Sequence, residues 1–588
     1  MINIKENEKL SMMNHSCAHL MAQAIKHLYP NALFWVGPVV ESGFYYDVDL
    51  GDEVIKEDDL VKIEKEMKKI SKDGKRIIRH EISKEEALEM FKDDPYKIDL
   101  ISRMDDNEQV ISCYSQGDFT DLCRGPHVDT VKELKYFKLI KFSGAYWKGD
   151  AKNKMLQRIY GVCFDNEEDL NSYLTELEEA KMRDHRKIGK DLEIFMTDDL
   201  VGRGLPMFLP NGCIIWQELE NYIKDKERKL NYKHVMTPCL GNVELYKTSG
   251  HWDHYKENMF PKMEVEGEEF VLRPMNCPHH MMIYANGLHS YKDLPIRIGE
   301  IAHDFRYEAS GALKGIERGR HFCQNDAHLF VTPEQIKSEF KAVVDLIFDV
   351  YKDFNITDFR CVLSLRDPED KQKYHPDDEM WIKAENELRE VLNDLKIDYT
   401  EEIGEAAFYG PKLDVNVKPA VGAEYTLSTC QLDFCLPAKF DLKYVDKDGE
   451  KKTPVVLHRA ILGSLDRFMA YILEETKGAL PLWLSPVQVN IIPVNNDFHL
   501  EYANNLKEKL SNLNIRCELD DRDEKLGYKI RESQTKKIPY TLVIGDKERD
   551  SNTVNYRKFG SQEAVSIDFS SFTDKILDEI KTKGVNKL

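Results

Sequence analysis

The chain has 588 residues, enough for three or four domains, and its 42% apolar and 32% charged content is that of an ordinary globular protein. No apolar run approaches the roughly 18 residues that span a bilayer, and the first residues lack the order of a secretory signal. Twelve cysteines without a CxxC pair indicate reduced thiols, so we expect a cytoplasmic protein with no membrane partner. The net charge of −21 argues weakly against a nucleic-acid partner, but it averages over the chain and leaves local basic surface open.

Residues 1–164 mix short helical patterns with strand-like runs. The clearest strand run is GFYYDVDL (43–50), and an amphipathic stretch follows at 57–72. From residue 165 to 192 the chain is strongly charged, with Leu170, Leu174 and Leu177 at helical spacing. This spacing predicts one long, solvated connecting helix.

Residues 193–484 form the longest block. Strand runs such as LDVNVKP and YTLSTCQLDF alternate unevenly with helices such as EQIKSEFKAVVDLIFDVYKDF, which favours a mostly antiparallel sheet. From residue 485 the alternation becomes regular: QVNIIPV, a helix over 498–512, IRCELDD, a helix over 525–536, then YTLVIGD. That order predicts a small α/β domain with a parallel sheet.

Two pairs of side chains in the N-terminal part have a spacing that brings both members together. His15 and His19 are four residues apart, so they share one face of a helix, and Cys123 and His127 repeat that spacing later in the chain. These four residues suit a tetrahedral zinc site, and equally a hydrolytic pocket in which histidine moves protons. Two unrelated helix faces with hydrogen-bonded histidines remain the simplest alternative for either pair alone.

Three further residues of ligand type are far apart in the sequence. They are Cys277 in RPMNCPHH, His328 in QNDAHLF and His458 in VVLHRAILGS. Their spacing does not indicate a metal, because a single cysteine or histidine is more often a packed or surface residue.

Arginines gather between residues 299 and 328. Arg306-x-Glu308 precedes a glycine-containing loop, after which Arg318, Arg320 and Phe322 follow. A guanidinium fork suits the α-phosphate of a nucleotide, and an aromatic ring can stack on its base. The chain has neither a Walker loop nor GxGxxG, so a glycine cradle would not hold such a nucleotide.

These segments together resemble the class II aminoacyl-tRNA synthetases, and the threonyl-tRNA synthetase family in particular. TSGHWDHYKENMF, RPMNCPHH, FRYE, residues 318–330, FYGPKLDV and HRAILGSLDRF are similar to its catalytic signatures. HSCAHLMAQAIKHLYP, GFYYDVD, PYKIDLI, DLCRGPHV and AYWKGD are similar to its editing domain. PYTLVIGDKE and the segment ending NYRKFG are similar to its anticodon-binding domain, so the resemblance covers essentially the whole chain in order.

The resemblance implies an α+β multidomain fold. It implies an α+β editing domain over 1–164, a connecting helix over 165–192, a class II antiparallel-sheet catalytic domain over 193–484 and an α/β anticodon-binding domain over 485–588. The implied enzyme is a homodimer formed around Pro238. It activates threonine with ATP and Mg²⁺, then transfers it to tRNA(Thr).

The resemblance also implies the residues of the synthetic site. One Zn²⁺ per subunit is expected on Cys277, His328 and His458, with positions left open for threonine. The residues expected around threonine are Asp326, Tyr409, Ser464, Met275 and Gln431. Those expected around ATP and the reacting groups are Arg306, Glu308, Phe322, Gln324 and Arg467.

Serine explains why a second, hydrolytic site is expected. Serine lacks only a methyl group of threonine, worth about 1–3 kcal/mol, which discriminates only about 10–200-fold. The resemblance places the hydrolysis of mischarged serine at His15, His19, Cys123, His127, Lys97, Asp121 and Tyr46, and favours water activation there over a second zinc. It also implies that Glu548 and Arg557 read anticodon bases, since single-stranded RNA is read by hydrogen bonds to splayed-out bases.

Two features depart from the family pattern. The chain begins almost directly at the editing domain, so the usual N-terminal β-grasp domain is expected to be missing. Near residue 425 the family usually has Trp-Gln-x-Gly-Thr-x-Gln, where this chain has Tyr425, Thr426, Leu427, Ser428, Thr429, Cys430 and Gln431. Ser428 adds a side chain where the family usually has none, so we expect it to reshape the substrate pocket. Because every expected metal ligand and arginine is present, our hypothesis is a functional enzyme. The alternatives are an RNA-binding regulator that does not charge tRNA and a stand-alone Ser-tRNA deacylase.

Overall fold

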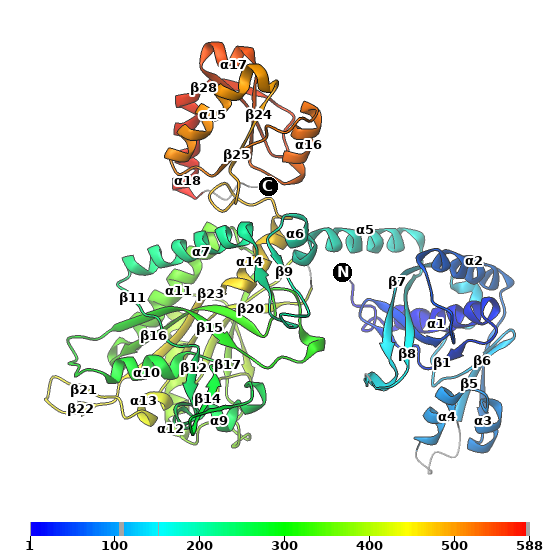
Figure 1. Ribbon diagram of the computed structural model, residues 1–588. Coiled ribbons are helices and arrows are strands. Elements are labelled where there is room, and N and C mark those ends of the chain that lie inside the picture. The colour runs from blue at the N-terminus through cyan, green and yellow to red at the C-terminus, as the bar shows by residue number, and fades with distance from the viewer. Residues whose placement is uncertain (1, 105–110, 151, 421, 584–588) are drawn as a thin grey trace. The chain divides into compact units, whose positions relative to one another are not determined.

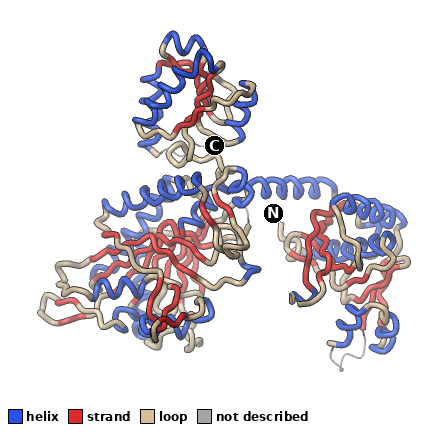
Figure 2. Tube along the Cα trace, viewed as in Figure 1, coloured by secondary structure: helices blue, strands red, loops and turns tan. Residues whose placement is uncertain are grey.

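The computed structural model describes residues 2–104, 111–150, 152–420 and 422–583. Its contacts divide the chain into two units, Met1–Glu179 and Ala180–Leu588 (Figures 1 and 2). Within these ranges no helix combines the length and apolarity needed to cross a membrane.

The first unit is built on helix α1 (Glu8–Leu28). Asn7 caps its first turn by accepting a hydrogen bond from the Leu10 amide, and Lys26 and His27 lie in the last turn, where the helix dipole favours cations. α1 packs against α2 (Glu57–Asp73) and against one face of an antiparallel sheet. That sheet has the order β1-β3-β8-β7, with β2 beside β3; its strands are β1 (Leu33–Phe34), β2 (Val39–Val40), β3 (Gly43–Asp49), β7 (Tyr136–Tyr146) and β8 (Met155–Phe164).

A smaller antiparallel sheet completes this unit. It has the order β4-β5-β6, and its elements are β4 (Ile77–Ile82), α3 (Lys84–Met90), α4 (Pro95–Ser102), β5 (Ile111–Gln116) and β6 (Phe119–Leu122). Lys97 lies on α4 and Asp121 on β6. The loop that follows β6 passes beside α1, so this sheet positions Cys123 and His127.

The connecting segment is two helices, not the one predicted. α5 (Glu167–Arg183) ends before Asp184, whose ψ of 116° is not helical, and α6 (His185–Asp191) begins after it. The Asp184 side chain caps α6 by accepting a hydrogen bond from the Arg186 amide. His185 is buried, with Nδ1 2.6 Å from Glu474 Oε1, and this long-range contact is invisible to helical periodicity.

The centre of the second unit is an eight-stranded sheet with the order β11-β15-β16-β23-β20-β19-β17-β18. Its inner pairs are antiparallel, as predicted, and only the two edge pairs are parallel. The strands are β11 (Lys233–His234), β15 (Ile296–Phe305), β16 (His321–Val331), β17 (Phe359–Leu365), β18 (Tyr399–Ile403), β19 (Lys412–Val417), β20 (Tyr425–Asp433) and β23 (Val455–Ser464).

Helices bury one face of this sheet and leave the other for a pocket. The core on the covered face contains residues of α7 (Pro210–Lys229), α11 (Ile336–Asp353), α12 (Asp378–Asp394) and α14 (Leu465–Glu475). On the opposite face, α10 (Cys277–Ala285) and α13 (Cys435–Lys439) pack with Phe330 and Val456 in a smaller core. The remaining small strands of this unit are β9 (Phe195–Met196), β10 (Met207–Phe208), β12 (Leu240–Asn242), β13 (Met263–Val265), β14 (Glu268–Leu272), β21 (Tyr444–Val445) and β22 (Lys451–Lys452), and its short helices include α8 (Val243–Ser249) and α9 (His251–His254).

The C-terminal part is a five-stranded sheet with the order β25-β24-β26-β27-β28. Its elements are β24 (Val489–Pro493), α15 (Asn496–Asn512), β25 (Cys517–Leu519), α16 (Leu526–Thr535), β26 (Tyr540–Ile544), α17 (Asp546–Ser551), β27 (Thr553–Lys558), β28 (Val565–Asp568) and α18 (Phe569–Thr582). The predicted parallel pairing holds for β25, β24 and β26, but β27 and β28 are antiparallel. A parallel crossover needs about a dozen residues, and the connection over 545–552 is too short for one.

Candidate active sites

Cys277, His328 and His458, which are far apart in sequence, meet in the second unit. Cys277 begins α10, and His328 and His458 are directly paired across β16 and β23. All three are buried, and one candidate ligand atom from each lies within 4.8 Å of the others. The antiparallel register therefore creates a cluster that spacing in the sequence did not indicate.

Carboxylates set the tautomers of both histidines. His458 Nε2 lies 2.7 Å from Asp433 Oδ2, so Nε2 carries the proton and Nδ1 keeps its lone pair. His280 Nε2 lies 3.1 Å from Glu300 Oε2, and His280 Nδ1 lies 2.7 Å from His328 Nδ1. His280 therefore donates to Glu300 and accepts from His328, which leaves a lone pair on His328 Nε2.

That nitrogen of His328 is buried and has no hydrogen-bond partner among the described residues. Burial lowers the pKa of His328 well below its ordinary value, so the ring is neutral. Burial also raises the pKa of the Cys277 thiol, helped by the nearby carboxylates. Two neutral imidazoles and one cysteine, each imidazole held from behind, form a donor set that fits Zn²⁺.

Two of these ligands, Cys277 and His458, line a cavity of about 610 Å³, named here the core pocket. Eight residues predicted for the synthetic site line it: Met275, Cys277, Arg306, Gln324, Asp326, Tyr409, Gln431 and His458. Gln324, Asp326 and His328 occupy every second position of β16, and therefore face the same side of the sheet.

Asp326 and Tyr409 provide polar groups in the core pocket. Burial raises the pKa of Asp326 to about 6. The Tyr409 hydroxyl donates to Gln431 Oε1, and its ring stacks on that of His458 with centroids 4.8 Å apart. A small polar ligand beside His458 would therefore meet a carboxylate, a phenol and an amide.

Of the residues predicted to bind ATP, Arg306 and Phe322 lie together, whereas Arg467 contacts other residues. The Arg306 guanidinium carbon lies 4.9 Å from the centroid of the Phe322 ring, at the edge of the core pocket. Arg467 instead lies 5.5 Å from the Tyr425 ring centroid and donates to the Thr426 carbonyl over 3.3 Å.

The remaining two residues of the predicted synthetic site have structural partners. Glu308 is paired with Arg318, with Oε2 2.9 Å from Nη2. Ser464 caps α14, where its hydroxyl accepts from the Arg467 amide. In this arrangement both side chains are held by their neighbours rather than lining the core pocket.

Ser428, which departs from the family pattern, does not enter the core pocket. Thr429 and Gln431 line that pocket, whereas Ser428 points to the helix-covered face of β20. There its hydroxyl lies 3.0 Å from the Tyr351 hydroxyl and donates to the Ile461 carbonyl. The expectation that Ser428 reshapes the substrate pocket is therefore wrong in its geometry, because successive strand residues face opposite sides.

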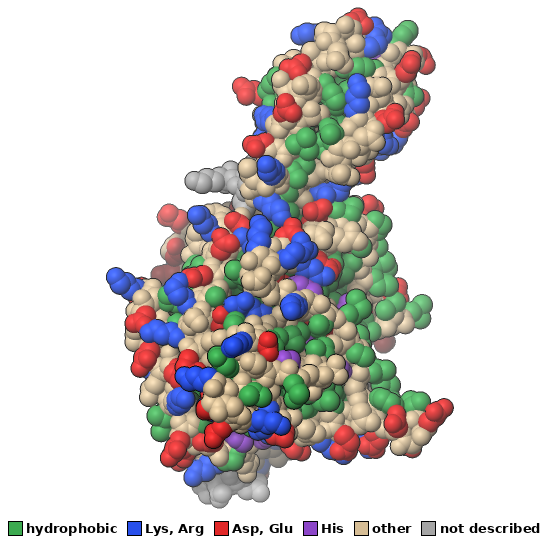
Figure 3. Space-filling view, turned by 90° about the vertical axis from the view of Figure 1, so that its left-hand side faces the viewer, with side chains coloured by type: hydrophobic (Ala, Val, Ile, Leu, Met, Phe, Trp, Pro, Cys, Tyr) green, Lys and Arg blue, Asp and Glu red, His purple; other side chains and the backbone are tan. Residues whose placement is uncertain are grey.

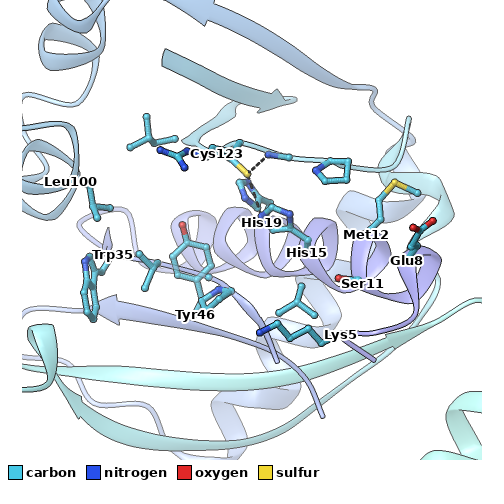
Figure 4. Close-up of a pocket in the computed structure, with 18 of the residues that line it drawn as sticks. Lys5, Glu8, Ser11, Met12, His15, His19, Trp35, Tyr46, Leu100 and Cys123 are labelled. Carbon is cyan, nitrogen blue, oxygen red and sulfur yellow. Dashed lines mark hydrogen bonds between the residues drawn. The ribbon is translucent and has the colours of Figure 1, made fainter. Parts of the chain in front are cut away.

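A second cavity, of about 950 Å³, lies in the first unit and is named here the α1 pocket. His15 and His19 project from α1 towards Cys123 (Figure 4). Cys123 Sγ lies 3.2 Å from His15 Nε2 and 3.1 Å from His127 Nε2, while His127 Nδ1 contacts Ser16 Oγ at 3.0 Å. The two spaced pairs predicted from sequence thus form one cluster, and the unrelated-faces alternative is excluded.

A glycine fixes the loop that carries Cys123. Gly125 has a φ of +74°, and a Cβ there would lie 2.2 Å from the Tyr114 hydroxyl. Its amide also donates to Cys123 Sγ over 3.2 Å. Both the left-handed backbone and the close approach of Tyr114 require glycine at this position.

A buried charge network lies behind the histidines. Lys97 Nζ is 2.5 Å from Asp121 Oδ1, and the Tyr46 hydroxyl donates to the same carboxylate. His19 Nδ1 lies 3.7 Å from Asp121 Oδ2. Burial alone would raise the pKa of Asp121, but Lys97 and His19 outweigh it, so the pKa is lowered and the carboxylate stays charged. All seven residues predicted for this pocket are therefore together.

Burial keeps the α1 pocket histidines neutral. It lowers the pKa of His15, and lowers that of His19 to about 4 and that of His127 to about 2. Burial raises the pKa of the Cys123 thiol to about 12, so it is protonated at neutral pH. The pocket therefore offers neutral imidazole bases beside a protonated thiol.

The two residues predicted to read RNA lie in the C-terminal sheet region. Glu548 is buried on α17, and its Oε2 accepts from the Gly545 amide over 3.0 Å, which caps its own helix. Arg557 lies on β27, and its Nε is buried with no hydrogen-bond partner within the described part of the chain. Their contacts do not test a role with nucleotides.

Sequence reasoning missed the residues that support the ligands. Asp433, His280, Glu300 and Ser16 orient histidines in the two sites. His280, three residues after Cys277 in RPMNCPHH, offered the only local signal. The others lie on separate elements, so no spacing connects them to the sites.

Three known family models match parts of the chain. Residues 260–476 match the model "tRNA synthetase class II core domain (G, H, P, S and T)", and residues 488–579 match "Anticodon binding domain". Residues 111–160 match "Threonyl and Alanyl tRNA synthetase second additional domain".

Relatives in other organisms span nearly the whole chain. The threonine–tRNA ligase of Staphylococcus epidermidis is 57% identical over 577 residues, which are 98% of this chain and 89% of that protein. That of Staphylococcus carnosus is 57% identical over 578 residues, with the same shares. The solved RNA binding domain of threonyl-tRNA synthetase from Cryptosporidium parvum, 36% identical, covers 67% of this chain and 98% of its own with a TM-score of 0.64. By these matches, the chain belongs to the threonine–tRNA ligase family of class II aminoacyl-tRNA synthetases.

Proposed function

We propose that this threonine–tRNA ligase activates threonine with ATP in the core pocket, transfers it to tRNA(Thr), and hydrolyses mischarged Ser-tRNA(Thr) in the α1 pocket. The observation that carries the first part is the meeting of Cys277, His328 and His458 at the wall of a cavity that also holds Arg306 and Asp326. The second part is supported by the seven-residue cluster around His15.

We assign Zn²⁺ to Cys277, His328 and His458. The support is the donor set itself and the buried Nε2 of His328, to which no described residue is hydrogen-bonded. When bound, zinc would act as a Lewis acid for the amino and hydroxyl groups of threonine. Asp326 would accept a hydrogen bond from the substrate, and Tyr409 and Gln431 would fix the side-chain orientation.

For the nucleotide, Arg306 supplies the charge that the α-phosphate requires. The Phe322 ring, whose centroid lies 4.9 Å from the Arg306 guanidinium carbon, would stack on one face of the adenine, and Arg467 would stack on the other. Mg²⁺ is expected to accompany ATP and to neutralise its phosphates. The threonine carboxylate then attacks the α-phosphorus, and pyrophosphate leaves.

In the α1 pocket we propose that a neutral histidine activates water. His15 lines the cavity, so its ring accepts a proton from a water at the ester carbon, while His19 is held beside Asp121. The raised pKa of Cys123 supports water, rather than a thiolate, as the nucleophile. Ser-tRNA then breaks into serine and tRNA, with the proton returned to the leaving ribose oxygen.

We also propose a homodimer formed around Pro238, acting in the cytoplasm. Met236 is 94% exposed and Leu240 is 45% exposed on either side of this proline. A partner subunit docked around Pro238 would remove both apolar side chains from water. Across the face drawn in Figure 3, basic side chains are interspersed with acidic ones. These lysines and arginines could contact tRNA phosphates although the net charge of the chain is −21.

The test is aminoacylation of tRNA(Thr) by the full-length protein with threonine and with serine. Cys277→Ser should abolish threonine charging, whereas Cys213→Ser, at an exposed cysteine on α7, should not. His15→Gln should allow serine charging to accumulate, and His27→Gln, at a histidine in the last turn of α1, should not. If folded, zinc-loaded protein charges tRNA(Thr) with threonine no faster than the background rate, the result would instead favour the regulator or deacylase hypotheses.

A further inference from the structure

A third cluster of metal-ligand type lies outside both pockets. His303 Nδ1 lies 2.9 Å from His321 Nε2 and 2.9 Å from Cys323 Sγ, and the three candidate ligand atoms all lie within 4.8 Å of one another. His303 is exposed, His321 is half-buried and Cys323 is buried. None of these residues takes part in the synthetic or hydrolytic chemistry proposed above.

Strand register explains why these three side chains converge. His303 on β15 is directly opposite Cys323 on β16, and His321 precedes Cys323 by two residues. Residues two apart on a strand and directly opposite on its neighbour share one face of the sheet. Gln324 and Asp326 occupy the alternate positions of β16 and line the core pocket, so the cluster lies on the reverse face of the same strand.

We propose that His303, His321 and Cys323 form a second binding site for a divalent cation of the zinc and cobalt class, on the face of β15 and β16 opposite the core pocket. Two imidazoles and a thiolate are the ligands that such ions select over harder cations. A water molecule reaching the exposed His303 side completes the fourth position. Binding replaces the thiol proton of Cys323 with the metal and releases that proton.

The geometry needs only a small adjustment. Tetrahedral coordination with the usual metal–nitrogen and metal–sulfur lengths separates ligand atoms by roughly 3.3–3.6 Å. The two separations of 2.9 Å are shorter than this by roughly half an ångström, and an outward rotation of the exposed His303 side chain would lengthen both. His321 is held in place by Phe305, whose ring centroid lies 4.9 Å away.

The backbone at Cys323 is fixed from below. The Asp466 carboxyl group accepts from the Cys323 amide over 2.7 Å, which holds the residue in its place on β16. Burial raises the pKa of the Cys323 thiol, and Asp466 and Asp304 raise it further, so the sulfur is a thiol in the absence of a cation. A bound metal ion would supply the positive charge that a thiolate here otherwise lacks.

The test uses Co²⁺, whose thiolate complexes absorb through a sulfur-to-metal charge-transfer band. The parent is full-length protein carrying Cys277→Ser and Cys123→Ser, which removes the thiol from each of the other two histidine–cysteine clusters. Titration should give one equivalent of Co²⁺ bound stoichiometrically at micromolar protein, with that band. Metal content after dialysis against Zn²⁺ should show the same equivalent.

Two variants in this background decide the outcome. His303→Gln changes an exposed side chain and should weaken Co²⁺ binding at least tenfold, and Cys323→Ser should remove the band. His80→Gln, at an exposed histidine on β4 outside all three clusters, should change neither. A band that survives His303→Gln unchanged, or binding seen only at millimolar Co²⁺, would overturn the proposal.

Discussion

At the residue scale, both pockets depend on carboxylates placed behind histidines. Asp433 holds His458, and Glu300 acts on His328 through His280, so each ring presents a lone pair in a fixed direction. In the α1 pocket Asp121 lies beside His19 while Lys97 balances its charge. The positioning of the rings is therefore as important to each site as the rings themselves.

Replacing Asp433 tests this positioning. In Asp433→Asn the side-chain carbonyl oxygen can still accept hydrogen bonds from the Cys435 and Leu436 amides. The side-chain NH2 group cannot accept from His458 Nε2–H, so that hydrogen bond is lost. Zinc affinity should fall about 10–100-fold. Competition with a chelator measures it, and Asp441→Asn, at an exposed carboxylate, is the matched control. Equal affinity in both variants would contradict the assigned tautomer.

Acid should destabilise the α1 region through His19. Its pKa in the folded state is about 4, below the ordinary value near 6.5. Between these values the unfolded chain binds a proton at His19 that the folded pocket excludes, so His19 alone lowers the free energy of unfolding by about 1.4 kcal/mol per pH unit as pH drops, and has no effect above pH 6.5. Hydrogen exchange of α1 amides at several pH values measures this slope. His19→Gln should make it shallower, and an unchanged slope would refute the low pKa.

At the element scale, strand β20 serves two regions at once. Thr429 and Gln431 face the core pocket, while Ser428 and Cys430 face the helices beneath. A β-bulge between Val415 and Asn416 on the neighbouring strand shifts the register at Thr426, whose hydroxyl donates to Asn416 Oδ1 over 2.8 Å. Substitutions one residue apart on β20 should therefore have different kinds of effect.

Ser428→Ala and Thr429→Val form the corresponding test. Ser428→Ala leaves the buried Tyr351 hydroxyl without its partner and should cost about 1–3 kcal/mol of stability, with little change in threonine-dependent pyrophosphate exchange. Adding Tyr351→Phe should recover much of that loss, because both partners are then removed. Thr429→Val removes a hydroxyl from the wall of the core pocket, together with its hydrogen bond to Asp414 Oδ1, and should raise KM for threonine about tenfold with little loss of stability. A KM effect confined to Ser428→Ala would reverse our assignment of the two faces.

At the scale of the whole molecule, the two chemistries lie in separate units. The α1 pocket is formed by residues before Glu179, and the core pocket by residues after Ala180. Serine that passes the core pocket, where a methyl group gives only modest discrimination, is removed in a site with its own fold. Sites without shared partners behave additively.

This separation predicts independent losses of activity. In Cys277→Ser, hydrolysis of pre-formed Ser-tRNA(Thr) should stay within about twofold of the parent although threonine charging is lost. In His15→Gln, hydrolysis should fall about 10²–10⁴-fold while threonine charging persists. Single-turnover deacylation and steady-state charging on the same preparations measure both. Loss of both activities in either variant would show that the sites are coupled.

The sequence by itself determined the family, the order of domains and the separate elements, because strand alternation, helical periodicity and the quoted motifs are local properties. It also brought together His15 with His19 and Cys123 with His127, since residues four apart share a helix face or a tight loop. The family resemblance, rather than spacing, grouped Cys277, His328 and His458. Only the tertiary structure decided which histidine nitrogen is free, which way Ser428 points, where the connecting helix breaks and that β27 and β28 pair antiparallel. These outcomes depend on strand register and on contacts such as Asp433–His458 and His185–Glu474, between residues that no local pattern connects.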